Sequence, residues 1–289
     1  MGINQLASPK VIAHRGASGY RPENTLEAFQ LGIDQGADGI EFDVVATKDK
    51  ELIIRHENKL SETTNISTIE SLSHLFNTVE KDYLSEALTL SQIKMLRAKE
   101  RIPEVRPGSA KFDEQFGIPT FAEVLDANFT QDKLIVAEIK QGSHLESLDE
   151  PIQELFAAVL AQHPAKGTLV VESFDYQILL DTKAQLESKN IKAQYFFLME
   201  QDRSELDLDS FDGISVSLEM LFSDKDWVAY AHQHNLQCWA YTARVENAQT
   251  SVEEYFEHII QKGVDGIFTD QPDLLRRVLD ERGGSTYDY

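Results

Sequence analysis

Short apolar runs alternate with helical patterns along almost the whole chain. Runs of β-branched and aromatic residues bounded by turn residues predict buried strands, at residues 10–14, 39–45, 51–56, 134–140, 168–174, 193–198, 213–217, 236–241 and 265–269. Between them, apolar residues that recur on one helical face predict helices, at residues 24–35, 151–162, 177–188, 225–234, 252–262 and 272–281. One more helix is expected from Pro119 onward, and Asn24 with Glu27 resembles a capping box at the start of the first helix.

Repeated strand–helix units of this kind favour a parallel sheet with its helices outside. About eight such units close into a TIM (β/α)8 barrel, so we predict a single barrel domain over residues 1–289. The alternative is an open doubly wound sheet. That alternative is weakened because no glycine-rich phosphate-binding sequence follows any of the predicted strands.

Residues 58–118 interrupt the alternation. This segment contains no convincing strand and is rich in turn-forming residues, serine and threonine. Insertions at the carboxyl ends of barrel strands shape access to the active site. We therefore interpret residues 58–118 as a small insertion at the catalytic rim; the alternative is a surface excursion without a role in function.

The excess of acidic residues disfavours nucleic acid and anionic membranes as binding partners. The chain has 27 basic and 49 acidic residues, and its formal net charge of −22 gives a field that repels nucleic acid and anionic bilayers. We therefore expect a small-molecule partner, with a local cation to offset the field if that partner is anionic. The single cysteine, Cys238, rules out an intramolecular disulfide, and no apolar run is long enough for an integral membrane segment. Nothing in the sequence indicates the oligomeric state.

Acidic side chains gather near the ends of predicted strands. Glu41 and Asp43 lie two positions apart on one strand and so share a face, and Glu138 follows a buried run on a later strand. If that face is the barrel interior, three carboxylates converge, and one would stay protonated unless a cation joined them. Ligation by carboxylate oxygens suits Ca²⁺ or Mg²⁺ rather than zinc. The alternatives are a solvated edge strand for Glu41 and Asp43 and a buried salt bridge for Glu138.

Imidazole and basic groups lie at the same strand ends. His14 and Arg15 end the first strand, His56 ends the return strand, and Lys140 shares a face with Glu138. Histidine suits general acid–base chemistry near neutral pH, and an arginine offers a planar fork of donors that matches phosphate. A lone histidine at a strand end is more often structural than catalytic, but His14 is followed directly by Arg15.

Several motifs in order resemble those of the glycerophosphodiester phosphodiesterases. The opening motif corresponds to residues 11–29 (VIAHRGASGYRPENTLEAF), and the next two to residues 36–44 (GADGIEFDV) and 52–60 (LIIRHENKL). Later motifs, including the end of the insertion found in longer members, correspond to residues 106–113 (RPGSAKFD), 118–124 (IPTFAEV), 138–140 (EIK), 172–174 (ESF), 238–239 (CW) and 265–273 (DGIFTDQPD). The likeness covers nearly the whole chain.

This resemblance implies a TIM barrel that hydrolyses glycerophosphodiesters, which are deacylated phospholipids such as glycerophosphocholine or glycerophosphoethanolamine, to glycerol 3-phosphate and an alcohol. It implies one divalent cation as cofactor, with Ca²⁺ preferred over Mg²⁺. By resemblance, the metal ligands are Glu41, Asp43 and Glu138. The acid and base are His14 and His56, and the substrate-binding residues are Arg15, Lys140 and Trp239.

Other points stay open at this stage. Longer family members are often exported, so we favour a mature periplasmic or secreted protein over a cytoplasmic one, although the first residues lack the basic and apolar regions of a signal peptide. Three rival functions are a phospholipase-type phosphodiesterase that acts on lipids, a catalytically silent glycerol-phosphate-binding protein, and a metal-independent hydrolase. The sequence does not say which histidine is the acid, or whether water or a substrate hydroxyl attacks first.

Overall fold

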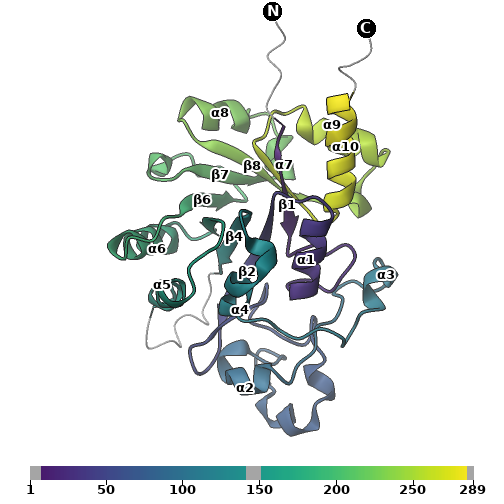
Figure 1. Cartoon of the computed structure of the whole chain (residues 1–289), viewed down its shortest axis with the longest axis vertical. Helices are drawn as coiled ribbons and strands as arrows, with labels where there is room; N and C mark the ends of the chain where they lie inside the picture. Colours follow the sequence, from purple (N-terminus) through teal and green to yellow (C-terminus); the bar gives the residue numbers. More distant parts are fainter. Residues whose placement is uncertain (1–7, 141–150, 285–289) are drawn as a thin grey trace, which may run out of the picture.

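Eight parallel strands form a closed barrel in the computed structural model, which describes residues 8–140 and 151–284 (Figure 1). In the order of their hydrogen bonding, the strands are β1 (Lys10–His14), β9 (Gly266–Thr269), β8 (Gln237–Ala243), β7 (Gly213–Ser217), β6 (Gln194–Met199), β5 (Thr168–Ser173), β4 (Leu134–Ile139) and β2 (Gly39–Ala46). Parallel pairing of β1 with β2 closes the circle. The predicted TIM barrel is therefore confirmed, and the open sheet is excluded because its end strands would not pair.

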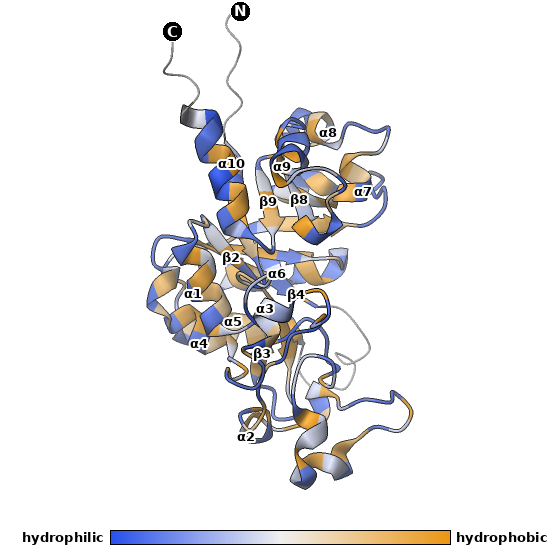
Figure 2. Ribbon diagram, turned by 90° about the vertical axis from the view of Figure 1, so that its right-hand side faces the viewer, coloured by the Kyte–Doolittle hydropathy of each residue, from blue (hydrophilic) through white to orange (hydrophobic). Residues whose placement is uncertain are grey.

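Amphipathic helices cover the outside of the barrel. They are α1 (Leu26–Asp34), α4 (Phe121–Asp126), α5 (Ile152–Gln162), α6 (Tyr176–Ser188), α7 (Leu218–Leu221), α8 (Trp227–Gln233), α9 (Val252–Ile260) and α10 (Pro272–Gly284). Figure 2 shows hydrophobic and hydrophilic residues interspersed along these helices. In α9, for example, Phe256 and Ile259 are buried while Glu253 and Glu254 are exposed, so burial of one face holds the helix on the sheet. None of the described helices is both long and apolar enough to cross a bilayer.

The first helix begins differently from the prediction. Thr25, not Asn24, is the N-cap of α1, and its side chain accepts a hydrogen bond from the Ala28 amide. Asn24 is fully buried, has a φ of 58°, and donates from Nδ2 to Asp43 Oδ2 at 2.8 Å. The capping box of Asn24 and Glu27 is therefore wrong, because the Asn24 side chain is used to hold a carboxylate at the end of the barrel.

Residues 58–118, which we call the rim segment, lie between β3 (Leu52–Ile54) and α4. β3 pairs antiparallel with β2, as the predicted return strand requires. The structure describes every residue of this segment, which forms isolated β-bridges but no strand. Its helices are three 3₁₀ turns, η1 (Ile66–Thr68), η2 (Glu70–Leu75) and η3 (Ser85–Ala87), and two short α-helices, α2 (Leu90–Ile93) and α3 (Pro107–Ala110). Figure 1 shows the part with α2 below β2 and α4.

A small apolar core of its own supports the rim segment. Leu60, Leu88, Ile93 and other buried side chains pack there against Val45 of β2 and Ile53 of β3. The segment is thus ordered by the hydrophobic effect and attached to the barrel beside the carboxyl end of β2. Its assignment as an insertion within one barrel domain stays a prediction.

A layer of large apolar side chains fills the barrel below the carboxyl ends of its strands. Phe196, Trp239 and Phe268 lie in this layer, with the Phe196 and Trp239 ring centroids 4.0 Å apart. Two glycines leave room for the rings: a Cβ at Gly213 would lie 2.2 Å from the Phe196 ring, and one at Gly266 would lie 2.8 Å from Trp239. This layer forms the floor on which polar side chains gather.

Candidate active site

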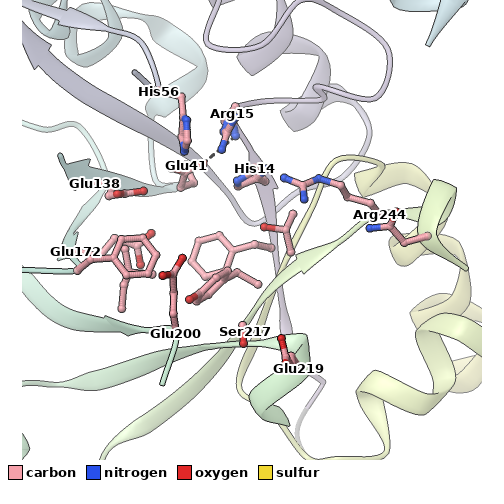
Figure 3. Close-up of a pocket in the computed structure, with 16 residues that line it drawn as sticks. His14, Arg15, Glu41, His56, Glu138, Glu172, Glu200, Ser217, Glu219 and Arg244 are labelled. Carbon is pink, nitrogen blue, oxygen red and sulfur yellow. Dashed lines mark hydrogen bonds between the residues drawn. The ribbon is translucent and has the colours of Figure 1, made fainter. Parts of the chain in front are cut away.

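A cavity of about 530 Å³ opens at the carboxyl ends of the barrel strands. Each of the eight parallel strands contributes lining residues, from the strand itself or from the loop that follows it. Figure 3 shows Glu41, Glu138 and the two candidate histidines around one end of this cavity, with Glu200, Ser217 and Glu219 at the other end. A second cavity of about 380 Å³ shares His14, Arg15 and His56 with the first, so the two histidines stand between the cavities. Active sites of TIM barrels occupy this face.

The structure brings the three predicted acidic residues together. Glu41 and Asp43 point inward from β2, and Glu138 points inward from β4, where it pairs in register with Asp43. One carboxylate oxygen from each residue lies within 4.8 Å of the other two, and all three residues are buried. Calcium–oxygen distances of about 2.3–2.6 Å place ligands on opposite sides of the ion about 5 Å apart. The three oxygens can therefore reach one divalent cation.

Two carboxylate oxygens of the cluster that accept no hydrogen bond within the described ranges also suit a divalent cation. Asp43 Oδ1 and Glu138 Oε1 are buried and accept no hydrogen bond from the described residues. Among the described residues, the ion pairs of these two oxygens are with Lys140, whose Nζ lies 3.5 Å from Asp43 Oδ1 and 2.6 Å from Glu138 Oε1. Buried carboxylate oxygens without donors are costly unless a cation compensates them. The chemistry of the donors suits Ca²⁺ or Mg²⁺.

Burial and mutual repulsion raise the pKa values of carboxyl groups in and beside the cluster. Burial raises the pKa of Glu41 well above its ordinary value, and the charges of Asp43, Glu172 and Glu138 raise it further. Burial also raises the pKa of Glu138, although Lys140 opposes that change. Glu172 is a buried carboxyl on β5, in register with Glu138, and burial raises its pKa well above the ordinary value. These three carboxyl groups therefore hold their protons more tightly than a carboxyl group in water does.

Asp43 is the acid that stays ionised. Burial alone would raise its pKa, but the positive charges of His56, Lys140 and Arg15 outweigh burial and hold the pKa well below its ordinary value. The hydrogen bond from Asn24 favours the same charged form. Asp43 is thus the anionic centre around which the site is built.

His14 is held by a buried aspartate. Its Nδ1 donates to Asp270 Oδ1 at 2.7 Å, and Asp270 follows the last barrel strand. Burial lowers the pKa of His14 to about 4, and the nearby Arg15 lowers it as well, whereas Asp270 acts in the opposite direction. At neutral pH the ring is therefore uncharged, and Nε2 is left as the proton acceptor.

His56 lies at the same end of the cavity, beyond the end of β3 (Figure 3). Its Nδ1 hydrogen-bonds to the adjacent Glu57 carboxylate. The His56 side chain is 27% exposed, whereas that of His14 is 11% exposed, so His56 has the better access to solvent. Both predicted histidines therefore face the cavity, and each is oriented through Nδ1 by a carboxylate.

Arg15 lies at the sharp turn out of β1, in the left-handed region with a φ of 54°. Its backbone amide donates to Glu41 Oε2 at 2.8 Å, which connects this strained turn to the acidic cluster. The guanidinium pairs with Glu23, and Nε, 3.5 Å from Asp43 Oδ2, has no hydrogen-bond acceptor among the described residues. Arg15 and Lys140 thus place positive charge beside the carboxylates.

Asp43 and Lys140 do not line the cavity themselves but contact Arg15 and Glu138, which do, whereas Trp239 lies elsewhere. It is 1% exposed, belongs to the apolar layer in the barrel and donates from Nε1 to Gln237. It does not line the cavity, so the structure gives no support for its predicted contact with substrate. Tyr241, two residues further along β8 and on the same face, lines the cavity instead, because positions nearer the carboxyl end of a barrel strand lie nearer the mouth.

Several residues of the site were not assigned a role from the sequence. Glu172 follows an apolar run on β5, which is the same signal that identified Glu138, so it could have been found. Arg101 in the rim segment could not, and Arg106 begins a recognised motif, but only the tertiary fold brings the two arginines to the histidines. Asp270 lay within a recognised motif, but its contact with a histidine 256 positions away is invisible in the sequence.

Comparison with known proteins shows the family to which the chain belongs. The model of the glycerophosphoryl diester phosphodiesterase family matches residues 14–274. A glycerophosphodiester phosphodiesterase of Caldanaerobacter subterraneus subsp. tengcongensis is 30% identical over 280 residues, covering 95% of this chain and 98% of that protein. A glycerophosphodiester phosphodiesterase of Bacillus subtilis is 29% identical, covering 92% of this chain and 85% of that protein.

Solved structures share the fold. A phosphodiesterase of Oleispira antarctica, solved in complex with its product sn-glycerol-3-phosphate, superimposes with a TM-score of 0.72 at 24% identity, covering 94% of this chain and 97% of that one. A glycerophosphodiester phosphodiesterase of Parabacteroides distasonis gives a TM-score of 0.68 at 21% identity, covering 96% of this chain and 98% of that one. From the family match over most of its length, and in agreement with its sequence motifs, the chain belongs to the glycerophosphoryl diester phosphodiesterase family.

Proposed function

We propose that this protein hydrolyses glycerophosphodiesters to sn-glycerol 3-phosphate and an alcohol, with the help of a divalent cation. The observation that carries the proposal is the buried cluster of Glu41, Asp43 and Glu138, two of which line one cavity together with the two histidines. The names of the matched relatives and the product bound to the Oleispira antarctica enzyme support the choice of substrate class.

The acidic cluster would hold the cation. Glu41, Asp43 and Glu138 supply the protein oxygens, and Ca²⁺ is preferred over Mg²⁺ because it accepts more oxygen ligands in less regular geometry. When bound, a divalent cation polarises a phosphoryl oxygen and offsets the charge that develops there. Lys140 and Arg15 would contact the phosphate, and the buried Arg15 Nε has a donor available for one of its oxygens.

The two histidines divide the proton transfers. His14 is neutral at neutral pH and keeps Nε2 free, so it is suited to take the proton of the attacking hydroxyl. His56 would then protonate the leaving alkoxide, which is a poor leaving group without a proton. The Nδ1 contacts with Asp270 and Glu57 orient the rings and stabilise their charged forms, as a carboxylate does in a catalytic triad.

The far end of the cavity suits an alcohol that carries a positive charge. Glu200 and Glu219 line that end and are exposed, and neither pairs with a cation among residues 8–140 and 151–284. Phe174 and Tyr241 line the cavity as well, with ring centroids 5.9 Å apart in a T-shaped arrangement. Carboxylates with aromatic rings attract ammonium groups. Glycerophosphocholine and glycerophosphoethanolamine are therefore the proposed substrates.

A substrate panel tests this function. Glycerophosphocholine, glycerophosphoethanolamine, glycerophosphoglycerol and phospholipid vesicles would each be incubated with Ca²⁺, and release of sn-glycerol 3-phosphate would be measured. We expect product from the soluble diesters, a preference for the two amine alcohols that weakens in Glu200→Gln and Glu219→Gln, and none from vesicles. Turnover of vesicles alone would favour the phospholipase, and binding without turnover in excess Ca²⁺ would favour a silent binding protein.

A further inference from the structure

Both histidines are backed by the same arrangement of charged groups. Asp270, which accepts from His14, also accepts from Arg106: Arg106 Nη2 lies 2.6 Å from Asp270 Oδ2. Glu57, which contacts His56, pairs with Arg101. Arg101 Nη1 and Nη2 donate to the two carboxylate oxygens of Glu57 at 2.9 and 2.7 Å. Each imidazole is thus followed by a carboxylate, and each carboxylate by an arginine.

The two arginines come from one short stretch of the rim segment. Arg101 and Arg106 are five positions apart in the sequence, whereas His14, His56 and Asp270 come from three separate parts of the barrel. Both arginines line the second cavity, to which Glu200 and Glu219 do not contribute.

Every nitrogen of the two guanidinium groups donates to at least one partner in the described part of the chain. Arg106 Nε donates to Glu246 Oε1 at 2.6 Å, and its Nη1 donates to the Ser18 carbonyl at 3.1 Å. Arg101 also donates to both oxygens of Glu23 and to Glu62. With their planar forks occupied in this way, the two side chains are fixed by their partners, and they are unsuited to direct contact with a phosphate.

We propose that Arg101 and Arg106 are positioning residues through which the rim segment orients both catalytic histidines. A carboxylate behind Nδ1 fixes the tautomer and direction of the ring, and an arginine that grips the carboxylate fixes the carboxylate in turn. This inference rests on the proposed histidine chemistry. It makes the rim segment part of the catalytic machinery rather than a surface excursion.

Burial predicts unequal contributions from the two arginines. The Arg106 and Asp270 side chains are 7% and 2% exposed, whereas those of Arg101 and Glu57 are 20% and 36% exposed. Ion pairs that solvent reaches are weaker. Arg106 should therefore matter more than Arg101. Asp270 keeps a second partner, Arg244 at 2.8 Å, so its charge stays paired when Arg106 is replaced, and we expect the variant to fold.

The test is a set of double-mutant cycles. Arg106→Gln and Arg101→Gln would be made alone and in the His14→Ala and His56→Ala backgrounds, and single-turnover rates and KM would be measured with glycerophosphocholine and Ca²⁺. Arg277→Gln, which removes an exposed arginine paired with Glu253 on the helical outside, is the matched control. Arg106→Lys keeps the charge but not the fork, and thermal unfolding of every variant checks the fold.

We expect Arg106→Gln to lower the rate about 10- to 100-fold with little change in KM, as loss of a group behind a functional ligand does. The effect should vanish in the His14→Ala background and persist with His56→Ala, and the reverse should hold for Arg101→Gln. Arg106→Lys should restore part of the rate, and Arg277→Gln should match the wild type. Equal effects in both backgrounds, or a loss confined to KM, would overturn the proposal.

A second readout does not depend on the substrate. Long-range ¹H–¹⁵N spectra report which ring nitrogen carries the proton, and His14 should be protonated on Nδ1 in the wild type and become a mixture of tautomers in Arg106→Gln. An unchanged His14 spectrum in a folded Arg106→Gln protein would contradict a positioning role. If the wild type hydrolysed no glycerophosphodiester, the proposed function would be wrong. The tautomer measurement would still show whether Arg106 orients His14.

Discussion

His14 combines the properties of a base with those of a buried side chain. The whole residue is 9% exposed, and its ring is hydrogen-bonded to Asp270. The ring is uncharged at neutral pH because burial and Arg15 lower its pKa to about 4. The same environment that prepares the ring for proton transfer makes its protonation unfavourable for the fold. Activity and acid stability are therefore linked through this one residue.

Removal of either histidine should abolish most of the activity. General acid or base catalysis contributes about 10²- to 10⁴-fold, so His14→Ala and His56→Ala should each lose at least two to three orders of magnitude in kcat. Steady-state rates with saturating Ca²⁺ provide the measurement. A variant of either residue with a near-wild-type rate would remove that histidine from the mechanism.

The lowered pKa of His14 predicts a dependence of stability on pH. Its folded-state pKa of about 4 lies below the value of 6.5 expected in the unfolded chain, so between these values the unfolded chain binds more protons. The stabilising contribution is complete above pH 6.5 and is lost as pH falls toward 4, by about 3 kcal/mol in total. Urea unfolding of the wild type and His14→Gln across this range measures it, and parallel pH profiles for the two proteins would contradict the assignment.

At the scale of elements, strands and helices were largely predictable because their signals are local. Apolar runs between turn residues identified the barrel strands, and every long helix matches a predicted helix to within a few residues. Asn24 shows where local reasoning fails. Its sequence context is that of a cap, but a carboxylate on β2 competes for its side chain. The short α2 and α3 were also missed, because four residues are too few to show a helical period.

Close packing of β2 against β4 gives a prediction at this scale. A Cβ at Gly39 would lie 2.4 Å from Leu134 Cβ and 2.5 Å from the Leu134 carbonyl oxygen, at the start of the strand that carries Glu41 and Asp43. Gly39→Ala should therefore destabilise the fold by about 1–3 kcal/mol through overpacking. The control is Gly108→Ala in the exposed α3, where a Cβ meets nothing within 4 Å. Chemical denaturation compares the two; equal midpoints would contradict the packing argument.

At the scale of the whole molecule, the net charge of −22 surrounds a site that must accept an anion. Arg15, Lys140 and a bound cation would provide the local positive charge, while the acidic exterior disfavours anionic bilayers. The sequence indicated this contrast, and its motifs indicated the acids and histidines. It could not indicate the arginines from the rim segment or the true position of Trp239, because both depend on how distant segments pack.

Cation binding should stabilise the folded protein and release protons. The raised pKa of Glu41 and Glu138 means that a cation competes with protons for these oxygens. At about 100 times its dissociation constant, Ca²⁺ should add about 2.7 kcal/mol to the free energy of unfolding. Calorimetry in buffers of different ionisation enthalpy measures the proton release. Glu138→Gln should bind Ca²⁺ far more weakly, and identical binding by that variant would exclude Glu138 as a ligand.

The most direct test of the central claim is hydrolysis of glycerophosphocholine followed by phosphorus NMR, before chelation, after exhaustive chelation and after Ca²⁺ is added back. The account predicts steady formation of sn-glycerol 3-phosphate, its loss on chelation and its recovery with Ca²⁺. Undiminished hydrolysis without any divalent cation, or no product in saturating Ca²⁺, would contradict it.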